Sequence, residues 1–410
     1  MNAMKPNTDR IQVTHVGSLS RPDSLLESNR RRPVAADGLR YEPSVEFDAA
    51  LAGAVDDVVA DQLAAGLTWV NDGEFGKAMT SELNFGAWWA YSFNRVEGLQ
   101  LFAPEESSQK PVHSEPGHIR LTTFGDRRDW VTFKDFYASP GSSFSSAVTR
   151  VARPETVAPL KYAGYVQVAA DVDNLKAAMA AHGVTDGFIT SISPASAARV
   201  GNRYYATEEE HVWAWAEVMR EEYLAITRAG LTVQIDDPFL AESWDQINPE
   251  PELDEYLAFL TPRVQALNWA LRDIPEDQIR YHLCWGSWHG PHTTDIPMAD
   301  IVGTMLQVNA GAYSFEAANA RHEHEWKVWQ DVTLPEGKVI LPGVVGHATN
   351  VVEHPDLVAE RIARFASVVG RERVIASTDC GLGGRVHPQI AAAKLQALGE
   401  GARRASAALF

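Results

Sequence analysis

The stretch Ile279-Arg280-Tyr281-His282-Leu283-Cys284 predicts a short strand that ends in two potential metal ligands. Side chains alternate between the faces of a strand, so His282 and Cys284 project on the same side. The chain's other cysteine, Cys380, also follows an apolar run, and Glu316 ends a third. We interpret these four residues as one mixed nitrogen, sulfur and oxygen site, most plausibly for zinc. The alternative is that both cysteines are buried small hydrophobic residues.

Strand-like runs of this kind recur along the whole chain and alternate with helical patterns. Eight strands separated by helices are what a (β/α)8 TIM barrel requires. A capping-box pair, Thr207 and Glu210, marks the start of the longest predicted helix, which ends at Gly230. The predicted strands are 11–18, 67–74, 187–194, 231–238, 279–284, 312–316, 339–347 and 374–380. The other predicted helices are 47–65, 172–181, 253–271, 299–309, 356–369 and 391–405.

Residues 85–160 interrupt this alternation after the second strand. The segment contains Trp88-Trp89, many other aromatic residues and the turn-forming run Ser139-Pro140-Gly141-Ser142-Ser143. We expect an insertion of strands and loops that covers the mouth of the barrel, where insertions commonly shape access to the site. Residues 1–410 would otherwise form a single catalytic domain.

Composition limits the class of protein. The formal net charge of −18 argues against non-specific binding of nucleic acid or anionic membranes. The polar N-terminus lacks an apolar signal core, no run reaches transmembrane length, and two distant cysteines give no disulfide framework. We therefore expect a cytoplasmic protein without a membrane or nucleic-acid partner. The sequence leaves its oligomeric state open.

Further polar residues end the other predicted strands. Ser18, Glu74, Asp236 and His347 each stand at or near the carboxyl end of a run. Active sites of (β/α)8 barrels lie at that end, so these side chains would share one rim with the metal ligands. Taken singly, each is also compatible with a cap or a turn.

The predicted ligands favour one reaction class over another. Two thiolates, an imidazole and a carboxylate would bring a bound Zn2+ to a net charge near −1, which damps its strength as a Lewis acid. Such a site suits alkyl transfer to a zinc-activated thiol, because a zinc-bound thiol is deprotonated at neutral pH. Hydrolysis by zinc-bound water is the competing class.

Seven motifs occur here in the order found in cobalamin-independent methionine synthase, and the sequence resembles the C-terminal catalytic barrel of that family. The resemblance covers nearly the whole chain apart from about 85–160. The motifs are Thr14-His15-Val16-Gly17-Ser18, Asp72-Gly73-Glu74-Phe75, Gln234-Ile235-Asp236-Asp237-Pro238, His282-Leu283-Cys284, Ser314-Phe315-Glu316, Gly346-His347-Ala348-Thr349-Asn350 and Asp379-Cys380-Gly381-Leu382.

The resemblance implies a homocysteine methyltransferase with methyltetrahydrofolate as a possible donor. It implies zinc on the four ligands named above, with the homocysteine sulfur added to them. It further implies that Ser18, Glu74 and Asp236 hold the amino and carboxylate ends of homocysteine, and that His347 is the general acid. Two carboxylates suit an ammonium group, and a histidine can protonate a leaving nitrogen.

Several features depart from the family pattern and leave the donor open. The segment 192–199 lacks the tryptophan that packs against folate in the family, Asp237 replaces a usual glutamate, and there is no room for the second barrel of the long form. Related epoxyalkane coenzyme M transferases activate a different thiol, so a thiol transferase of that type is one alternative. A barrel that binds a thiol or metal without catalysis is another.

Histidines outside the proposed ligand set have simpler interpretations. His289 and His292 follow the ligand strand, and either could contact substrate or form ordinary loop hydrogen bonds. The tract 321–326 contains two histidines but lacks the His-Glu-x-x-His spacing of a helical zinc site, and we expect a solvated helix start.

Overall fold

A computed structural model describes residues 6–80, 86–139 and 152–410. Its centre is a parallel sheet of seven strands in the order β1-β4-β6-β7-β8-β9-β10. Strands β2, β3 and β5 form a separate three-stranded sheet. The strands are β1 Val70–Asn71, β2 Val96–Phe102, β3 Arg153–Tyr162, β4 Gly187–Ile192, β5 Gly201–Asn202, β6 Thr232–Asp237, β7 Ile279–Leu283, β8 Ala312–Phe315, β9 Val339–Val345 and β10 Ser377–Thr378.

An eighth, extended segment closes the ring of strands. Val13 forms a parallel bridge with Ala376, just before β10, and its carbonyl accepts hydrogen bonds from the backbone N–H groups of Thr68 and Trp69, just before β1. This segment therefore occupies the position of the first predicted strand, although it makes only one bridge. The predicted (β/α)8 barrel is confirmed, with shorter first, second and last strands than expected.

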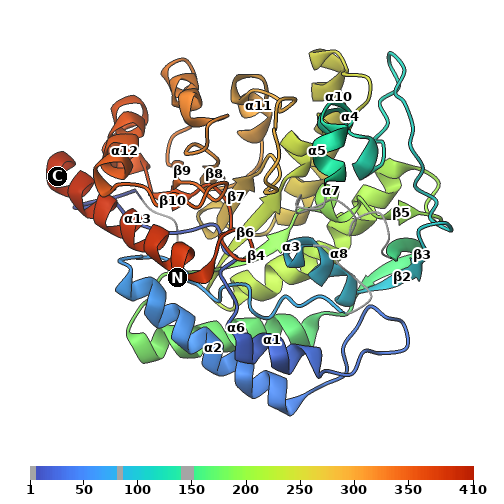
Figure 1. The fold of residues 1–410 in the computed structure, drawn as a ribbon, viewed down its shortest axis with the longest axis horizontal. Coiled ribbons are helices and arrows are strands. Elements are labelled where there is room, and N and C mark those ends of the chain that lie inside the picture. Colours follow the sequence, from blue (N-terminus) through green and yellow to red (C-terminus); the bar gives the residue numbers. More distant parts are fainter. Residues whose placement is uncertain (1–5, 81–85, 140–151) are drawn as a thin grey trace.

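Helices flank the central strands in the view of Figure 1, with α12 and α13 on the left and α2 and α6 below, while β2, β3 and β5 lie on the right. The α-helices are α1 Asp23–Arg30, α2 Val45–Ala64, α3 Ala87–Ala90, α4 Arg128–Thr132, α5 Lys134–Ala138, α6 Tyr165–His182, α7 Pro194–Ala197, α8 Glu208–Arg228, α9 Phe239–Glu242, α10 Leu253–Leu271, α11 Met298–Met305, α12 Pro355–Val369 and α13 Pro388–Leu409. Short 3-10 helices are η1 Tyr91–Asn94, η2 Phe124–Asp126, η3 Glu276–Gln278, η4 Glu323–Gln330 and η5 Arg371–Arg373.

Local sequence explains why these elements form. In β7, Ile279, Tyr281 and Leu283 belong to the main hydrophobic core between sheet and helices. The alternate residues Arg280 and His282 therefore face the barrel interior. Helix α8 begins as predicted, because the hydroxyl of Thr207 accepts a hydrogen bond from the backbone N–H of Glu210.

The insertion after the second barrel strand contributes two strands to the small sheet, and the third strand, β5, comes from the main chain of the barrel. Strands β2 and β3 pair antiparallel, and β3 also pairs with β5, which follows β4. Residue 85 and residues 140–151, which include most of the predicted turn at 139–143, lie outside the described residues. Within the described part of the chain, no helix is long and apolar enough to cross a membrane.

Candidate metal centre

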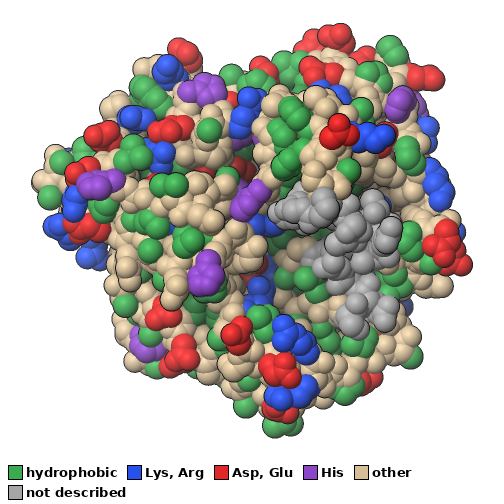
Figure 2. Space-filling model, viewed as in Figure 1, with side chains coloured by type: hydrophobic (Ala, Val, Ile, Leu, Met, Phe, Trp, Pro, Cys, Tyr) green, Lys and Arg blue, Asp and Glu red, His purple; other side chains and the backbone are tan. Residues whose placement is uncertain are grey.

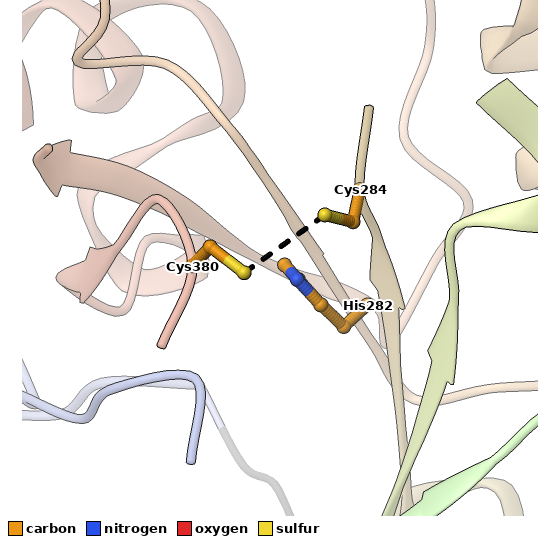
Figure 3. Close-up of side chains that lie close together, drawn as sticks. All are labelled: His282, Cys284 and Cys380. Carbon is orange, nitrogen blue, oxygen red and sulfur yellow. Dashed lines mark hydrogen bonds between the residues drawn. The ribbon is translucent and has the colours of Figure 1, made fainter. Parts of the chain in front are cut away.

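The carboxyl ends of β7 and β10 bring three of the predicted ligands together. Figure 3 shows His282, Cys284 and Cys380 pointing toward one another, and their potential ligand atoms all lie within 4.8 Å. The two sulfur atoms are 3.9 Å apart. Nδ1 of His282 lies 3.2 Å from the hydroxyl of Ser314, whereas its Nε2 is buried and has no hydrogen-bond partner among the described residues.

The two cysteine side chains act on each other. The contact between the Cys284 and Cys380 sulfurs, together with His282, lowers the pKa of Cys380 well below its usual value. The same contact and burial raise the pKa of Cys284 well above its usual value.

Glu316, the fourth predicted ligand, lies in an adjoining group. Its carboxylate is within 4.8 Å of potential ligand atoms of His347 and Asp379. One of its oxygens accepts a hydrogen bond from the backbone N–H of Trp285 at 3.0 Å, and the other from Asn319 at 2.8 Å. Burial raises the pKa of Glu316 to about 8, and the negative charges of Asp379 and Cys380 add to this effect.

The three converging residues fit a zinc ion. The unpaired Nε2 of His282 and the two sulfurs are the donors that zinc prefers, and hydrogen bonding of the other imidazole nitrogen is typical of a metal-bound histidine. A cation would also relieve the cost of burying thiolates and a carboxylate together. The carboxylate of Glu316 remains a candidate fourth ligand, since ligating carboxylates usually keep hydrogen bonds of this kind.

Glu74 and Asp236 form a second polar group one strand away from this centre. Asp236 is the register partner of His282 in the pairing of β6 with β7. Burial raises the pKa of Asp236 to about 7, and the negative charge of Glu74 contributes. One oxygen of Glu74 accepts a hydrogen bond from Thr190 at 2.6 Å, while the other is buried without a partner among the described residues.

Ser18 lies between Glu74 and the loop that follows Cys380. Its carbonyl accepts hydrogen bonds from the N–H groups of Leu382 and Gly383, at 2.9 and 3.0 Å. The preceding Gly17 has a φ of +138°, and a Cβ there would lie 2.8 Å from the carboxylate of Glu74. A glycine is therefore required for the chain to pass this close to Glu74.

His347 follows β9 and is fully buried beside Glu316. Burial lowers its pKa to about 4, so its imidazole is neutral at pH 7. Its Nδ1 has no hydrogen-bond partner among the described residues. The exposed His289 lies nearby, with its Nε2 3.3 Å from the backbone carbonyl of His347.

The prediction of a solvated start for the tract 321–326 is wrong at His322. This side chain is 3% exposed, packs against the ring of Trp285, and contacts the carboxylates of Asp295 and Glu325 at 3.2 and 2.8 Å. Asp295 also contacts His292, so this histidine makes a hydrogen bond within the loop that follows the ligand strand. This buried ion cluster fixes the loop directly after Cys284.

Sequence reasoning assigned no role to two buried residues of the rim. Lys77 is 3% exposed and its ammonium group lies 3.6 Å from Glu74. Asp379 accepts hydrogen bonds from the N–H groups of Ala317 and Ala318, at 2.7 and 2.8 Å. Each lies within three positions of a predicted site residue, and this closeness in the sequence is the one feature that could have indicated a role.

Two curated proteins are similar to part of this chain. A curated 2-hydroxypropyl-CoM lyase of Xanthobacter autotrophicus is 23% identical over 229 residues, which cover 49% of this chain and 56% of that protein. A methionine synthase of Thermococcus kodakarensis is 24% identical over 182 residues, covering 44% of this chain and 46% of that protein. The chain thus matches about half the length of these curated relatives.

A solved structure shows the same fold over nearly its whole length. The B12-independent methionine synthase from Shewanella sp. W3-18-1, in complex with selenomethionine, superimposes with a TM-score of 0.68 at 16% identity, covering 98% of this chain and 99% of that one. The sequence model of the cobalamin-independent synthase catalytic domain matches residues 142–403, which is more than half of the chain. This protein belongs to the family of the cobalamin-independent synthase catalytic domain.

Proposed function

We propose that this protein transfers a methyl or other alkyl group onto the sulfur of a small-molecule thiol, with homocysteine as the leading acceptor. The observation that carries the proposal is the convergence of His282, Cys284 and Cys380 at the carboxyl ends of barrel strands. These residues would hold zinc, with Glu316 as a fourth, exchangeable ligand. Zinc at that position would keep a substrate thiol deprotonated and nucleophilic at neutral pH.

The neighbouring residues would orient the acceptor. The buried, unpaired oxygen of Glu74 and the carboxylate of Asp236 suit the ammonium group of an amino acid. Ser18 lies between this pair and the loop after Cys380, where its hydroxyl and backbone would meet the carboxylate end. An acceptor held in this way has its sulfur directed toward the metal ligands one strand away.

The transfer would form a bond between the thiolate sulfur and the alkyl carbon of the donor. The bond between that carbon and the leaving atom of the donor breaks, and its electron pair stays on the leaving atom. That atom, a nitrogen in methyltetrahydrofolate, then takes a proton. His347 lies beside Glu316, and we assign it to pass this proton to the leaving nitrogen after its Nδ1, unpartnered among the described residues, has taken one up.

The donor side would be shaped by the insertion. Asp129, at the start of α4, accepts hydrogen bonds from both the backbone N–H and the hydroxyl of Thr293, in the loop after the ligand Cys284. Arg127 lies 4.3 Å from the ring centre of Trp288 in the same loop. Figure 2 shows a hollow near the middle of the face seen in Figure 1, with histidine and basic side chains beside it. We propose that the insertion covers part of the barrel mouth.

A second candidate is a thiol transferase that opens an epoxide or demethylates a methoxylated compound. The match to the Xanthobacter lyase and the segment 192–199, which lacks a tryptophan, favour it. The two candidates differ in the thiol that they require, so a thiol titration separates them.

Metal analysis combined with X-ray absorption tests the proposal. We expect about one zinc per chain with sulfur and nitrogen ligands, and one added sulfur ligand when homocysteine is present. A sulfur ligand gained only from another thiol would favour the second candidate. A protein that binds no zinc would contradict both.

A further inference from the structure

The turn that carries Glu74 also carries Lys77, three residues later. The backbone N–H of Lys77 donates to the carbonyl of Glu74 at 3.0 Å, and Glu74 has a φ of +61°, a left-handed conformation that is unusual for a side chain of this size. The guanidinium of Arg21 donates to the carbonyls of both residues. This strained turn is therefore held so that the two side chains lie together.

The ammonium group of Lys77 is fixed from several sides. It hydrogen-bonds to the hydroxyl of Thr190, which in turn donates to Glu74 at 2.6 Å. It also lies 4.3 Å from the ring centre of Tyr91, a residue of the insertion. The hydroxyl of Tyr91 donates to the buried Glu222 at 2.9 Å, so the ring has little freedom to move.

Lys77 is thus a buried positive charge beside the two carboxylates assigned to the amino end of the acceptor. It lies 3.6 Å from Glu74, and its charge also acts on Asp236. Two ionised carboxylates that share a buried site repel each other, whereas two carboxylates with one ammonium group leave a single net negative charge. One substrate ammonium group then balances the charge of these three side chains.

We propose that Lys77 is a specificity-determining residue that sets the charge of this subsite, so that it matches a thiol carrying one ammonium group. The inference rests on the proposed function, because it assumes that Glu74 and Asp236 hold the acceptor. In this proposal the positive charge of Lys77 affects substrate binding. A purely structural lysine would only hold the turn in place.

A double-mutant cycle distinguishes the two roles. The dissociation constant of homocysteine is measured by calorimetry on zinc-loaded wild-type protein, Glu74→Gln, Lys77→Met and the double variant. Glu74→Gln leaves Lys77 facing the substrate ammonium group, and we expect binding to weaken at least about tenfold. Adding Lys77→Met restores the single negative charge, and we expect most of that loss to be recovered. Lys77→Arg keeps the charge and serves as the matched variant. Lys176→Met removes an exposed lysine and controls for the loss of a positive charge far from the site.

The same titrations with 4-mercaptobutyrate, which lacks the ammonium group, should show no recovery in the double variant. A double variant that binds homocysteine more weakly than Glu74→Gln would overturn the charge role of Lys77 and leave the proposed function intact. Wild-type protein that binds neither thiol would overturn the proposed function together with this inference. Thermal unfolding of all variants shows whether a change in binding reflects a change in folding.

Discussion

Cys284 and Cys380 are 96 positions apart in the sequence, yet their sulfur atoms lie 3.9 Å apart. They follow β7 and β10, which are separated in the sheet by β8 and β9. Strands that are parallel and curl into a barrel end on one rim, so residues just beyond two such strands can meet across it. The two cysteines are therefore brought together by the fold of the barrel and not by a local sequence motif.

Replacement of either cysteine should remove the metal. Cys284→Ser or Cys380→Ser leaves a hydroxyl that is a poor zinc ligand, and we expect zinc affinity to fall more than about 100-fold, since even outer residues of metal sites cost 10–100-fold. Alkyl transfer should be lost with the metal. Zinc content and turnover of the two variants check this. Full turnover by a variant without metal would contradict the proposed function.

Binding of homocysteine should weaken at acidic pH. Burial and Glu74 raise the pKa of Asp236 to about 7, and only the ionised carboxylate attracts an ammonium group. Affinity should therefore fall as pH drops through 7, approaching about tenfold per pH unit well below it. Calorimetric titrations at several pH values measure this dependence. The analogue 4-mercaptobutyrate reports the pH dependence of the thiol alone, and Asp236→Asn should remove the difference between the two ligands.

Much of the site is predictable because side chains alternate along a strand and because parallel strands end on one rim. His282 and Cys284 share a side because they are two apart, and Cys380 meets them because its run ends on the same rim. The barrel and most helix positions follow from the same alternation of runs. For the helix Leu253–Leu271, the structure has the predicted bounds.

The remaining features depend on contacts between distant segments, which periodicity does not encode. His322 is buried because Asp295 and Trp285 approach it from another loop. The hydrogen bonds of Glu316 come from Trp285 and Asn319, and Lys77 becomes part of the site only through an irregular turn. A tract rich in charge therefore predicts a solvated segment, since burial of a charge requires partners that the local sequence does not show.

Substitution of His347 should slow the transfer step without changing the binding of zinc or of the acceptor thiol. His347→Gln keeps a hydrogen-bonding side chain of similar reach but cannot transfer a proton as imidazole does. We expect kcat to fall about 100-fold or more, a typical loss for a general acid, while zinc content and the affinity for the acceptor thiol stay unchanged. Single-turnover kinetics with a methyl donor measure the effect. An unchanged rate of the transfer step would remove His347 from the mechanism.

The contact between the insertion and the ligand loop should stabilise the protein. Asp129 is 1% exposed and accepts hydrogen bonds from the backbone N–H and the hydroxyl of Thr293 and from the hydroxyl of Tyr137, the last at 2.7 Å. Asp129→Ala removes these bonds and leaves buried donors unpaired, so we expect the free energy of unfolding to fall by about 2–4 kcal/mol. Thr293→Val removes only the bond from the Thr293 hydroxyl and should cost less. Denaturant unfolding measures both changes, and zinc content should stay at the wild-type level because no metal ligand is altered. Equal stability of Asp129→Ala and wild-type protein would show that the insertion does not hold the loop after Cys284 in place.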